Sequence, residues 1–254
     1  MYRDVEHPAL GTWPLQNAPF KMSETPAFNS RPGPLIGGHN KEVFEGLLGI
    51  SHEELVNGFE DGTFWPKDLS MDEYPYFKKM MEDPTLVRWD GNEPMANPGP
   101  APARTPGAGA FGGLRVLELA DEKGQWCGKQ MADMGADVIK VEQRGTGDPG
   151  RWLTAAGGRE TGDQPNWYFE ANNRNKRSIT LDLKKPEGLE VMLALVEKSD
   201  VFVQNFRKGV AGRNGLGYDA LSKINPGLIY ASATGYGPEG PDSAEPSFDY
   251  LGLA

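Results

Sequence analysis

The sequence has one cysteine, three histidines and no surplus of positive charge. Because Cys127 is the only cysteine among 254 residues, an internal disulfide is excluded and a reducing compartment is expected. One cysteine and the scattered His7, His39 and His52 cannot form a zinc site at the usual ligand spacing, so we expect no metal. The formal net charge of −10 argues against a general nucleic-acid binder, since phosphate backbones attract basic surfaces.

Long apolar runs and several well-known motifs are also missing. No segment approaches the roughly 18 consecutive apolar residues of a membrane helix, and the start, MYRDVEHPALG, lacks the features of a signal peptide. We therefore expect a soluble, cytoplasmic protein. The sequence contains neither the G-x-S-x-G of a hydrolase nor the G-K-[ST] of a phosphate loop. Only Gly124 and Gly128 stand where a dinucleotide-binding loop would need three glycines, so a nicotinamide or flavin cofactor is not expected.

The first part of the chain changes character twice. Residues 1–38 are rich in proline and glycine and predict irregular structure. Asn40 then suits a helix N-cap, and Ser51 with Glu54 forms a capping-box pattern, which together predict two short helices ending near Gly62. Residues 63–112 predict a linker rich in proline and glycine, with a short helix around residues 71–82 and a domain boundary at about residue 112.

From residue 113 the pattern alternates between strands and helices. The expected strands are Val116–Leu119, a second through Val138, Ile139 and Val141, then Val201–Val203 and Leu228–Ala231. The expected helices are Trp126–Met134, one that starts at Pro186 and extends to Val196, and Tyr218–Ile224. Such alternation predicts an α/β fold with a doubly wound parallel sheet. Ligands of these sheets bind beyond the carboxyl ends of the strands, so the loops after the strands are the candidate site.

Basic residues gather in these loops. The positions concerned are Lys140, Arg144, Arg151, Arg174, Lys176 and Arg177, and the loop QNFRKGVAGRNGLG adds Arg207 and Arg213. Cations near strand ends can hold a phosphorylated ligand through charge-assisted hydrogen bonds. The same composition is also typical of a solvated charged surface, and composition alone leaves both interpretations open. In the loop QNFRKGVAGRNGLG, the aromatic Phe206 beside Asn205 suits a nucleotide-like ligand.

Taken together, these loops resemble those of the family III CoA-transferases, which include formyl-CoA transferase, carnitine CoA-transferase and α-methylacyl-CoA racemase. The resemblance covers residues 113–254 and rests on GLRVLEL, MADMGADVIKVEQRGTGD, NNRNKRSITLDLKKPEG, DVFVQNFRKGVAGRNGLGYDALSKINPGLIYASATGYGPEGP and SFDY. It implies a Rossmann-like large domain, incomplete in this chain, and coenzyme A or an acyl-CoA as the ligand.

The resemblance also implies which residues contact CoA. They are Glu122, Lys123, Gln143, Arg144, Leu181, Asp182, Leu183, Lys184, Asn205, Phe206, Arg207, Arg213, Pro246, Ser247, Phe248 and Asp249. Two departures from the family pattern affect this set. The first loop is one residue short and has Gln125 where proline is usual, and Gln143 stands where a basic residue often meets the adenine.

Residues 1–62 resemble the closing stretch of the same family, through VEHPALGTW, KMSETPAF, RPGPLIGGHNKEVFEGLLGIS and HEEL. Because an ending then precedes a beginning, the resemblance implies a tandem fusion: the C-terminal segment of an upstream copy (1–62), a linker (63–112) and the N-terminal CoA-binding part of a second copy (113–254). An independent small domain at 1–62 is the alternative. In this family the large domain is built from both chain ends and two protomers interlock, so an interlocked dimer or pseudo-dimer is expected.

The chemistry implied by the resemblance is CoA transfer from an acyl-CoA thioester to a carboxylic acid through aspartyl-anhydride and aspartyl-CoA intermediates. The nucleophilic aspartate is expected beyond residue 254, so no catalytic residue is assigned in this chain, which is expected to be inactive alone. Three alternatives are CoA transfer coupled to lyase chemistry, racemase-type isomerisation and a non-catalytic CoA-binding scaffold. The racemase alternative needs a histidine base directly before Asp249, where Phe248 stands and cannot accept a proton.

Overall fold

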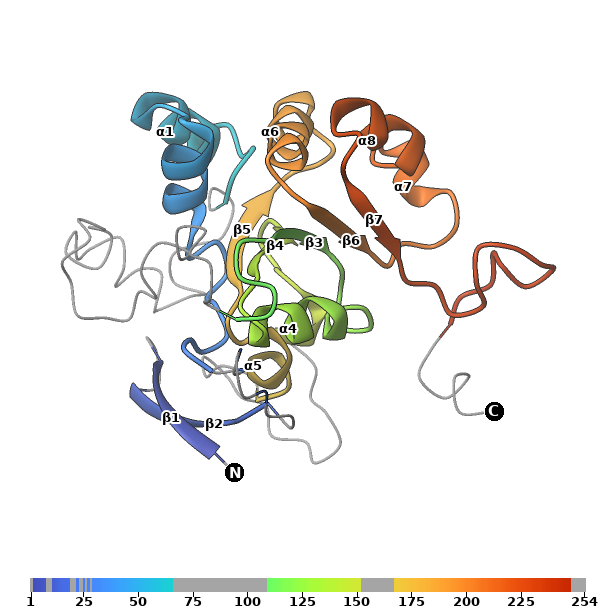
Figure 1. Cartoon of the computed structure of the whole chain (residues 1–254). Helices are drawn as coiled ribbons and strands as arrows, with labels where there is room; N and C mark the ends of the chain where they lie inside the picture. The colour runs from blue at the N-terminus through green and yellow to red at the C-terminus, as the bar shows by residue number, and fades with distance from the viewer. Residues whose placement is uncertain are drawn as a thin grey trace.

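The computed structural model describes residues 2–7, 11–18, 22, 25, 27, 29–65, 109–151 and 167–247. Figure 1 shows a central sheet with helices above and below it and a two-stranded hairpin near the N-terminus. Within the described residues, no helix combines the length and apolar character needed to cross a membrane.

A five-stranded, all-parallel sheet forms the centre of the molecule, in the order β5-β4-β3-β6-β7. Its strands are β3 (Arg115–Leu119), β4 (Asp137–Gln143), β5 (Arg177–Leu181), β6 (Val201–Gln204) and β7 (Ile229–Ser232). Val116 of β3 pairs with Val138 of β4 on one side and with Val201 of β6 on the other. Because β4 and β6 lie on opposite sides of β3, the strand order reverses between β3 and β6, and a ligand-binding crevice is expected there.

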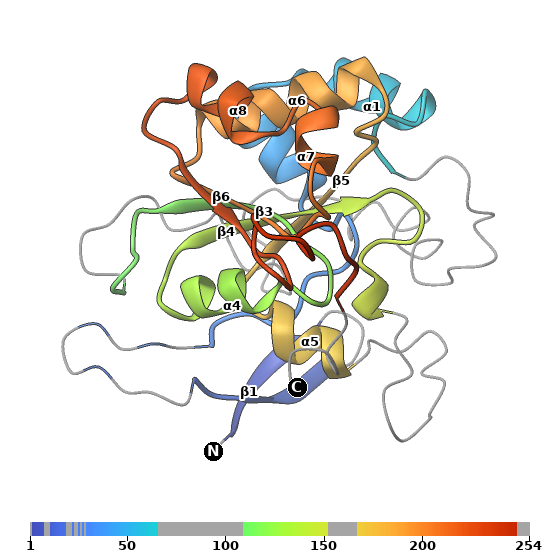
Figure 2. The same cartoon turned by 90° about the vertical axis from the view of Figure 1, so that its right-hand side faces the viewer.

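Helices cover both faces of the sheet (Figures 1 and 2). One face carries α4 (Trp126–Asp133) and α5 (Trp167–Asn173), and the other carries α6 (Pro186–Glu197), α7 (Val210–Arg213) and α8 (Tyr218–Ile224). The short 3-10 helix η2 (Pro149–Arg151) follows β4. Two apolar clusters fill the two sides, and strand residues enter them alternately: Val116 belongs to the cluster with Ala132 of α4, whereas Leu117 belongs to the cluster with Met192 of α6. The predicted doubly wound parallel sheet is confirmed.

Strand β5 is absent from the strands predicted from the sequence, although the helix that follows it, α6, was located correctly. Its residues, RSITL, are all buried, and they follow the basic stretch NNRNK. Polar and apolar residues alternate in β5, which normally indicates a strand with one exposed face, but both faces of β5 are buried. Ser178 and Thr180 are buried because the N-terminal part of the chain covers them and provides their hydrogen-bond partners. The helices α5 and α7 were also missed.

The prediction of irregular structure over residues 1–38 is wrong at its start. Strands β1 (Tyr2–His7) and β2 (Gly11–Gln16) pair in antiparallel fashion to form a hairpin. Three buried side chains fix its inner face: Val5, His7 and Leu15. The apolar signal was weak because polar and charged residues occupy most other positions, and Pro14 discouraged a strand assignment although an edge strand tolerates proline.

Two helical segments follow, as predicted, but one differs in detail. The π-helix η1 (Glu42–Leu48) and the α-helix α1 (His52–Glu60) occupy the expected region, and Ser51 with Glu54 forms the predicted capping box. Asn40 is not a capping residue. Its side chain instead donates to Thr180 Oγ1 at 3.0 Å and accepts from the Thr180 backbone N–H at 2.9 Å, which joins the start of η1 to β5.

The segment 29–65 therefore packs on the sheet as part of its core. Val43, Phe44, Leu55 and Phe64 belong to the same apolar cluster as the strand residues on that side. Residues 63–65 of the predicted linker are buried in this packing. The predicted helix around 71–82 and the remainder of the linker up to residue 108 lie outside the described residues.

Candidate functional site

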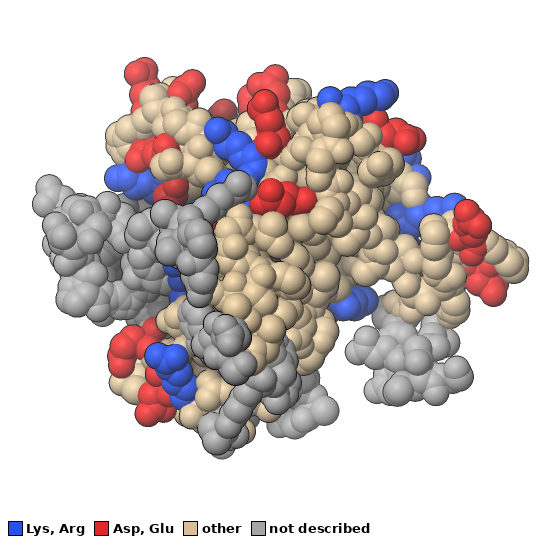
Figure 3. Space-filling view, in the orientation of Figure 1, with Lys and Arg blue, Asp and Glu red and all other residues tan. Residues whose placement is uncertain are grey.

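A hollow of about 470 Å³ lies at the carboxyl ends of β3, β6 and β7, at the reversal of strand order. We call it the β3/β6 hollow. Figure 3 shows a notch between the body of the molecule and the segment that follows β7, residues 233–247. The lining residues are Asp121, Lys123, Asn205, Phe206, Arg207, Lys208, Ala233, Thr234, Gly235, Tyr236, Ser243, Glu245, Pro246 and Ser247. Three strand ends and a more distant segment thus meet around one space.

Two loops are joined at the base of the hollow by a reciprocal pair of hydrogen bonds. Asn205 Nδ2 donates to Asp121 Oδ1 at 2.5 Å, and the Asp121 backbone N–H donates to Asn205 Oδ1 at 3.1 Å. Burial would raise the pKa of Asp121, but hydrogen bonds from Asn205 and Lys123 outweigh burial and lower it. Asp121 is therefore a fixed carboxylate that aligns the ends of β3 and β6.

Lys123, in the loop after β3, forms ion pairs with two carboxylates. Its Nζ lies 2.5 Å from Glu122 Oε1 and 3.3 Å from Asp121 Oδ2. Partial burial would lower the pKa of Lys123, but Glu122 and Asp121 outweigh burial and raise it. Lys123 stays charged at neutral pH, and much of its charge is balanced locally.

The loop after β6 carries two cations that, unlike Lys123, form no ion pair with the described residues. Gln204 fixes the start of this loop, because its Oε1 accepts from the Phe206 backbone N–H at 2.7 Å and its Nε2 donates to Ser232 at 2.6 Å. Arg207 and Lys208 follow and are exposed. Lys208 Nζ donates to Ser243 Oγ at 2.8 Å, whereas no ion pair joins Arg207 to any residue in the described part of the chain. An anion that enters the hollow can therefore bind the Arg207 guanidinium without displacing an internal partner.

The far wall of the hollow depends on a close approach at Gly235. A Cβ atom at this position would lie 2.0 Å from the Ser247 Cβ, so any other residue would push the C-terminal segment away. Together with the Lys208–Ser243 hydrogen bond, this contact keeps residues 243–247 against the ends of β6 and β7.

The structure brings together six of the residues that the resemblance assigned to CoA. Those lining the hollow are Lys123, Asn205, Phe206, Arg207, Pro246 and Ser247. Glu122 is adjacent and holds Lys123. Arg213 is exposed on α7, where its guanidinium lies near Gly209 and outside the lining. Phe248 and Asp249 lie outside the described residues.

The remaining assigned residues form a second group at the ends of β4 and β5. Arg144 Nε lies 3.3 Å from Asp182 Oδ2, and the Lys184 backbone N–H donates to Asp182 Oδ1 at 3.0 Å. Leu181 is buried, Leu183 is half-buried and Gln143 is exposed. This group borders Gly62, whose added Cβ would lie 2.5 Å from an Arg144 nitrogen. It shares the carboxyl edge of the sheet with the hollow, and its strand β4 lies directly beside β3, whose loop lines the hollow.

Several lining residues were not predicted from the sequence. Asp121 and Lys208 had a usable signal, because each follows a predicted strand within a few residues of an assigned position. Ser243, Tyr236 and Glu245 had none, since only the folded path of the chain after β7 places them beside the loops after β3 and β6.

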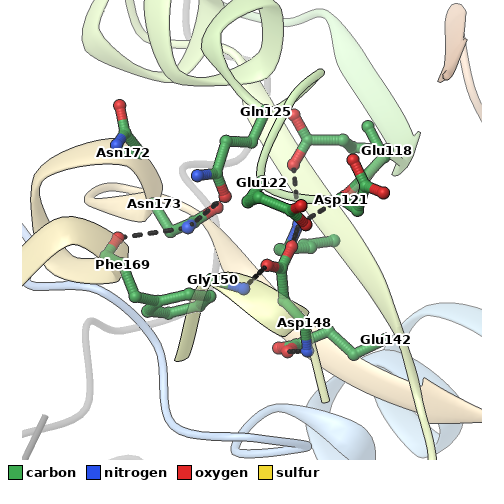
Figure 4. A network of polar contacts seen from close by, with 12 residues as sticks. Glu118, Asp121, Glu122, Gln125, Glu142, Asp148, Gly150, Phe169, Asn172 and Asn173 are labelled. Carbon is green, nitrogen blue, oxygen red and sulfur yellow. Dashed lines mark hydrogen bonds and ion pairs between the residues drawn. The ribbon is translucent and has the colours of Figure 1, made fainter. Parts of the chain in front are cut away.

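Five of the basic residues proposed for a phosphorylated ligand or a solvated surface have neither role, because each is held in an ion pair; four of them are buried and Arg151 is half-buried. The pairs with their nitrogen–oxygen distances are Lys140–Asp148 (2.6 Å), Arg151–Glu142 (2.6 Å), Arg174–Asp133 (2.6 Å), Lys176–Glu118 (2.7 Å) and Arg177–Asp137 (2.7 Å). Figure 4 shows the carboxylates Glu118, Glu142 and Asp148 close together between the strand ends and α5. Both interpretations fail for these five residues, since each already has a carboxylate partner and the side chain of Arg151, the most exposed of them, is only 12% exposed.

Comparison with known proteins gives a consistent result. Residues 111–254 match the sequence model of CoA-transferase family III. An acyl-CoA transferase of Fusarium pseudograminearum is 42% identical over 151 residues, which cover 58% of this chain and 33% of that protein. A succinate–glutarate CoA-transferase of Agrobacterium fabrum is 43% identical over 145 residues (55% and 36%), and a formyl-CoA:oxalate CoA-transferase of Afipia carboxidovorans is 45% identical over 132 residues (52% and 30%).

A solved structure agrees with these sequence matches. The CAIB/BAIF family protein from Brucella suis superimposes with a TM-score of 0.51 at 42% identity, over 56% of this chain and 38% of that one. The chain thus spans about a third of the length of the curated relatives that it matches.

Proposed function

Because the chain belongs to CoA-transferase family III, we propose that the β3/β6 hollow binds CoA within an enzyme that moves CoA from an acyl-CoA thioester to a carboxylic acid. The proposal rests on one observation above the others. Arg207, an exposed base that makes no ion pair with any described residue, lies at the reversal of strand order, where doubly wound sheets bind their ligands. The reactions named for the relatives support this class of chemistry.

The composition of the hollow suits a ligand with an anionic end and an apolar body. Arg207 and Lys208 supply positive charge, and arginine matches phosphate oxygens through paired N–H donors. Phe206 lines the same space while its ring packs partly against the core, so it offers a fixed apolar wall. Asn205 is held by Asp121 and keeps that wall aligned with the first loop.

A ligand as long as CoA would also reach the second group of residues. The ends of β6 and β5 are three strand spacings apart, which is about 14 Å at the usual strand separation. We propose that Gln143, Arg144 and the residues from Leu181 to Lys184 contact one arm of CoA while the β3/β6 hollow holds the other. Arg144 would then share its guanidinium between Asp182 and the ligand.

For the chemical step we propose an aspartate nucleophile supplied by a part of the polypeptide outside residues 1–254. Its carboxylate oxygen would attack the donor thioester carbon, breaking the C–S bond, so that CoA leaves as the thiolate and an acyl-aspartyl anhydride forms. The thiolate would then attack the aspartyl carbonyl, release the donor acid and leave an aspartyl-CoA thioester for the acceptor carboxylate. A carboxylate is a weak nucleophile, so the binding loops must supply most of the catalysis by holding the thioester in place.

We also propose that residues 1–62 are the C-terminal segment of an upstream copy, joined by residues 63–112 to a second copy that begins at 113. The contacts of segment 29–65 support this arrangement. Its backbone and side chains bind β5 and α5 through buried hydrogen bonds, such as the Gly33 N–H to Glu170 at 2.7 Å and Asn40 to Thr180. In the intact protein such packing would produce an interlocked pseudo-dimer from one polypeptide, with acyl-CoA and a carboxylic acid as its small-molecule partners.

Titration calorimetry of the chain with CoA tests the proposed binding site. We expect one CoA per chain with a Kd of about 1–100 μM, competition by adenosine 3′,5′-bisphosphate, and no competition by NAD⁺. A chain that shows no heat and no change in thermal midpoint with about 1 mM CoA would contradict the proposal. Displacement of CoA by NAD⁺ would contradict it too, since it would indicate a general dinucleotide site.

A further inference from the structure

The loop that brings Asp121 and Lys123 to the hollow is held at both ends by buried lysines. Lys140 of β4 donates its Nζ to the carbonyl of Ala120, where the loop begins, at 2.6 Å. Lys176, directly before β5, donates its Nζ to the carbonyl of Gln125, where the loop ends, at 2.9 Å. Both lysines are at most 1% exposed, so neither can touch a ligand in the hollow.

Two carboxylates and one amide complete this arrangement. Lys140 Nζ lies 2.6 Å from Asp148 Oδ2 and 3.7 Å from Glu118 Oε2, while Lys176 Nζ lies 2.7 Å from Glu118 Oε2 and 3.0 Å from Asn173 Oδ1. Two positive and two negative charges balance within the cluster. We call these four charged residues, Glu118, Lys140, Asp148 and Lys176, the loop clamp.

The end of the loop has an additional anchor in the side chain of Gln125. Figure 4 shows its side chain and that of Asn173 pointing toward each other, and Asn173 Nδ2 donates to Gln125 Oε1 at 2.7 Å. Because Asn173 also accepts from Lys176, the side chain and the carbonyl of Gln125 are fixed by one connected set of hydrogen bonds.

Stability alone gives a poor account of such a cluster. Moving charges out of water costs several kcal/mol per ion, and well-packed apolar residues often replace a buried ion pair without loss. What apolar side chains could not replace is the donation to two loop carbonyls, which fixes the loop relative to β4 and α5. Arg174 offers a contrast, because it is equally buried and paired with Asp133, yet its hydrogen bonds go to Asp133 and the Ala171 carbonyl and not to the loop.

We propose, on the basis of the CoA site proposed above, that Lys140 and Lys176 are positioning residues that hold the Ala120–Gln125 loop in the geometry that binds CoA. They act through the two loop carbonyls, and Asp121, Asn205 and Lys123 transmit that geometry to the hollow.

Paired substitutions test the loop clamp without leaving an unbalanced charge. E118Q/K176M and K140M/D148N each remove one cation together with one anion, and E118Q/K176Q restores amide donors at position 176. We expect the first two variants to bind CoA about tenfold more weakly, the effect of losing one hydrogen bond to a charged group. Amide hydrogen exchange should accelerate in residues 120–125 but not in β6, and E118Q/K176Q should recover most of the affinity. Arg174→Met is the control for loss of a buried base that does not bind the loop, with affinity and loop exchange unchanged in the folded protein.

A measurement on the unaltered chain covers the case in which the variants do not fold. Burial lowers the pKa of Lys176 to about 8, with Lys140 acting in the same direction and Glu118 and Asp148 opposing. The other groups near it are Gln125, Asn173 and the titratable thiol of Cys127, whose pKa is raised by burial and by Glu118. Loss of the Lys176 proton should therefore accelerate exchange in the loop, relative to intrinsic rates, between about pH 7 and about pH 9.

Folded paired variants with wild-type affinity and wild-type loop exchange would overturn the proposal, and so would an Arg174→Met variant that weakens CoA binding equally. Loop exchange that shows no change between about pH 7 and about pH 9 would overturn it for Lys176. If the unaltered chain does not bind CoA, the proposed function fails, and the exchange data still decide whether the lysines hold the loop.

Discussion

Two regions of the molecule contain similar basic sequences and use them in opposite ways. In NNRNKR, before and within β5, Arg174, Lys176 and Arg177 are at most 3% exposed and each is paired with a carboxylate. In NFRK, after β6, Arg207 and Lys208 are exposed and border a hollow. The first region is part of the scaffold, and the second is available to a ligand. Basic side chains near strand ends are therefore insufficient evidence of an anion site.

The difference arises from carboxylates that are distant in the sequence. Asp133 lies 41 positions before Arg174, and Glu118 lies 58 positions before Lys176. Parallel pairing of β3, β4 and β5 brings Glu118 near Lys176, and the packing of α4 against α5 brings Asp133 beside Arg174. At β6 the neighbours are β3 and β7, and the acid nearest the loop, Asp121, is already bound to Asn205 and Lys123. Topology thus decides which bases are neutralised.

The largest expected effect contrasts the two regions through stability. Arg174→Met should lower the free energy of unfolding by about 3 kcal/mol, the lower end of the range for a broken buried pair, because Asp133 keeps only the more distant Lys129, at 3.7 Å, as a cationic partner. Arg207→Met should change it by less than about 0.5 kcal/mol, as is usual for an exposed side chain. Urea unfolding of both variants measures these free energies. Equal decreases in the two variants would contradict the assignment of Arg174 to the scaffold and of Arg207 to the ligand site.

A loss of the free energy of unfolding of similar size should appear at low pH, and it should come from the buried carboxylates only. Burial would raise the pKa of Glu142, but Arg151, Lys140 and Ser178 outweigh it and lower the pKa from 4.5 to about 2. A depressed carboxyl pKa stabilises the folded state fully above the unfolded value of 4.5, and that contribution is lost as pH falls from 4.5 to about 2. The contribution is about 3 kcal/mol, because each pH unit between the folded and unfolded pKa values corresponds to about 1.4 kcal/mol.

The comparison of wild type with Glu142→Gln isolates this contribution. The difference in their unfolding free energies should be greatest near neutral pH and shrink as pH falls below about 4.5. Glu245→Gln, at the exposed rim of the hollow, serves as the matched control and should show no such pH-dependent difference. A Glu142 difference that is constant with pH would contradict the assignment.

Much of the fold could be predicted from local patterns. Strands β3, β4, β6 and β7 and helices α4, α6 and α8 were located because apolar periodicity, proline and glycine mark them clearly. Strand β5 and the β1–β2 hairpin were missed for a common reason. Their apolar residues are few, and their polar residues are buried by contacts with remote segments, as Thr180 is by Asn40. Such burial leaves no local signal.

The candidate site divides in the same way. Asn205, Phe206 and Arg207 could be assigned because the motif that contains them is specific and follows a strand directly. Ser243 could not be assigned, because its contact with Lys208 depends on how the chain turns after β7. The burial of Lys140 and Lys176 was likewise hidden, since a lysine in a sequence gives no sign of the carboxylates that surround it.

CoA affinity compared between Arg207→Met and Arg174→Met tests most directly the claim that the bases at the end of β6 bind the ligand while those around β5 form the scaffold. Calorimetry on folded protein should show affinity about tenfold weaker for Arg207→Met, because a charge-assisted contact to phosphate is lost, and unchanged for Arg174→Met. Unchanged affinity for Arg207→Met together with weaker binding by Arg174→Met would contradict the account.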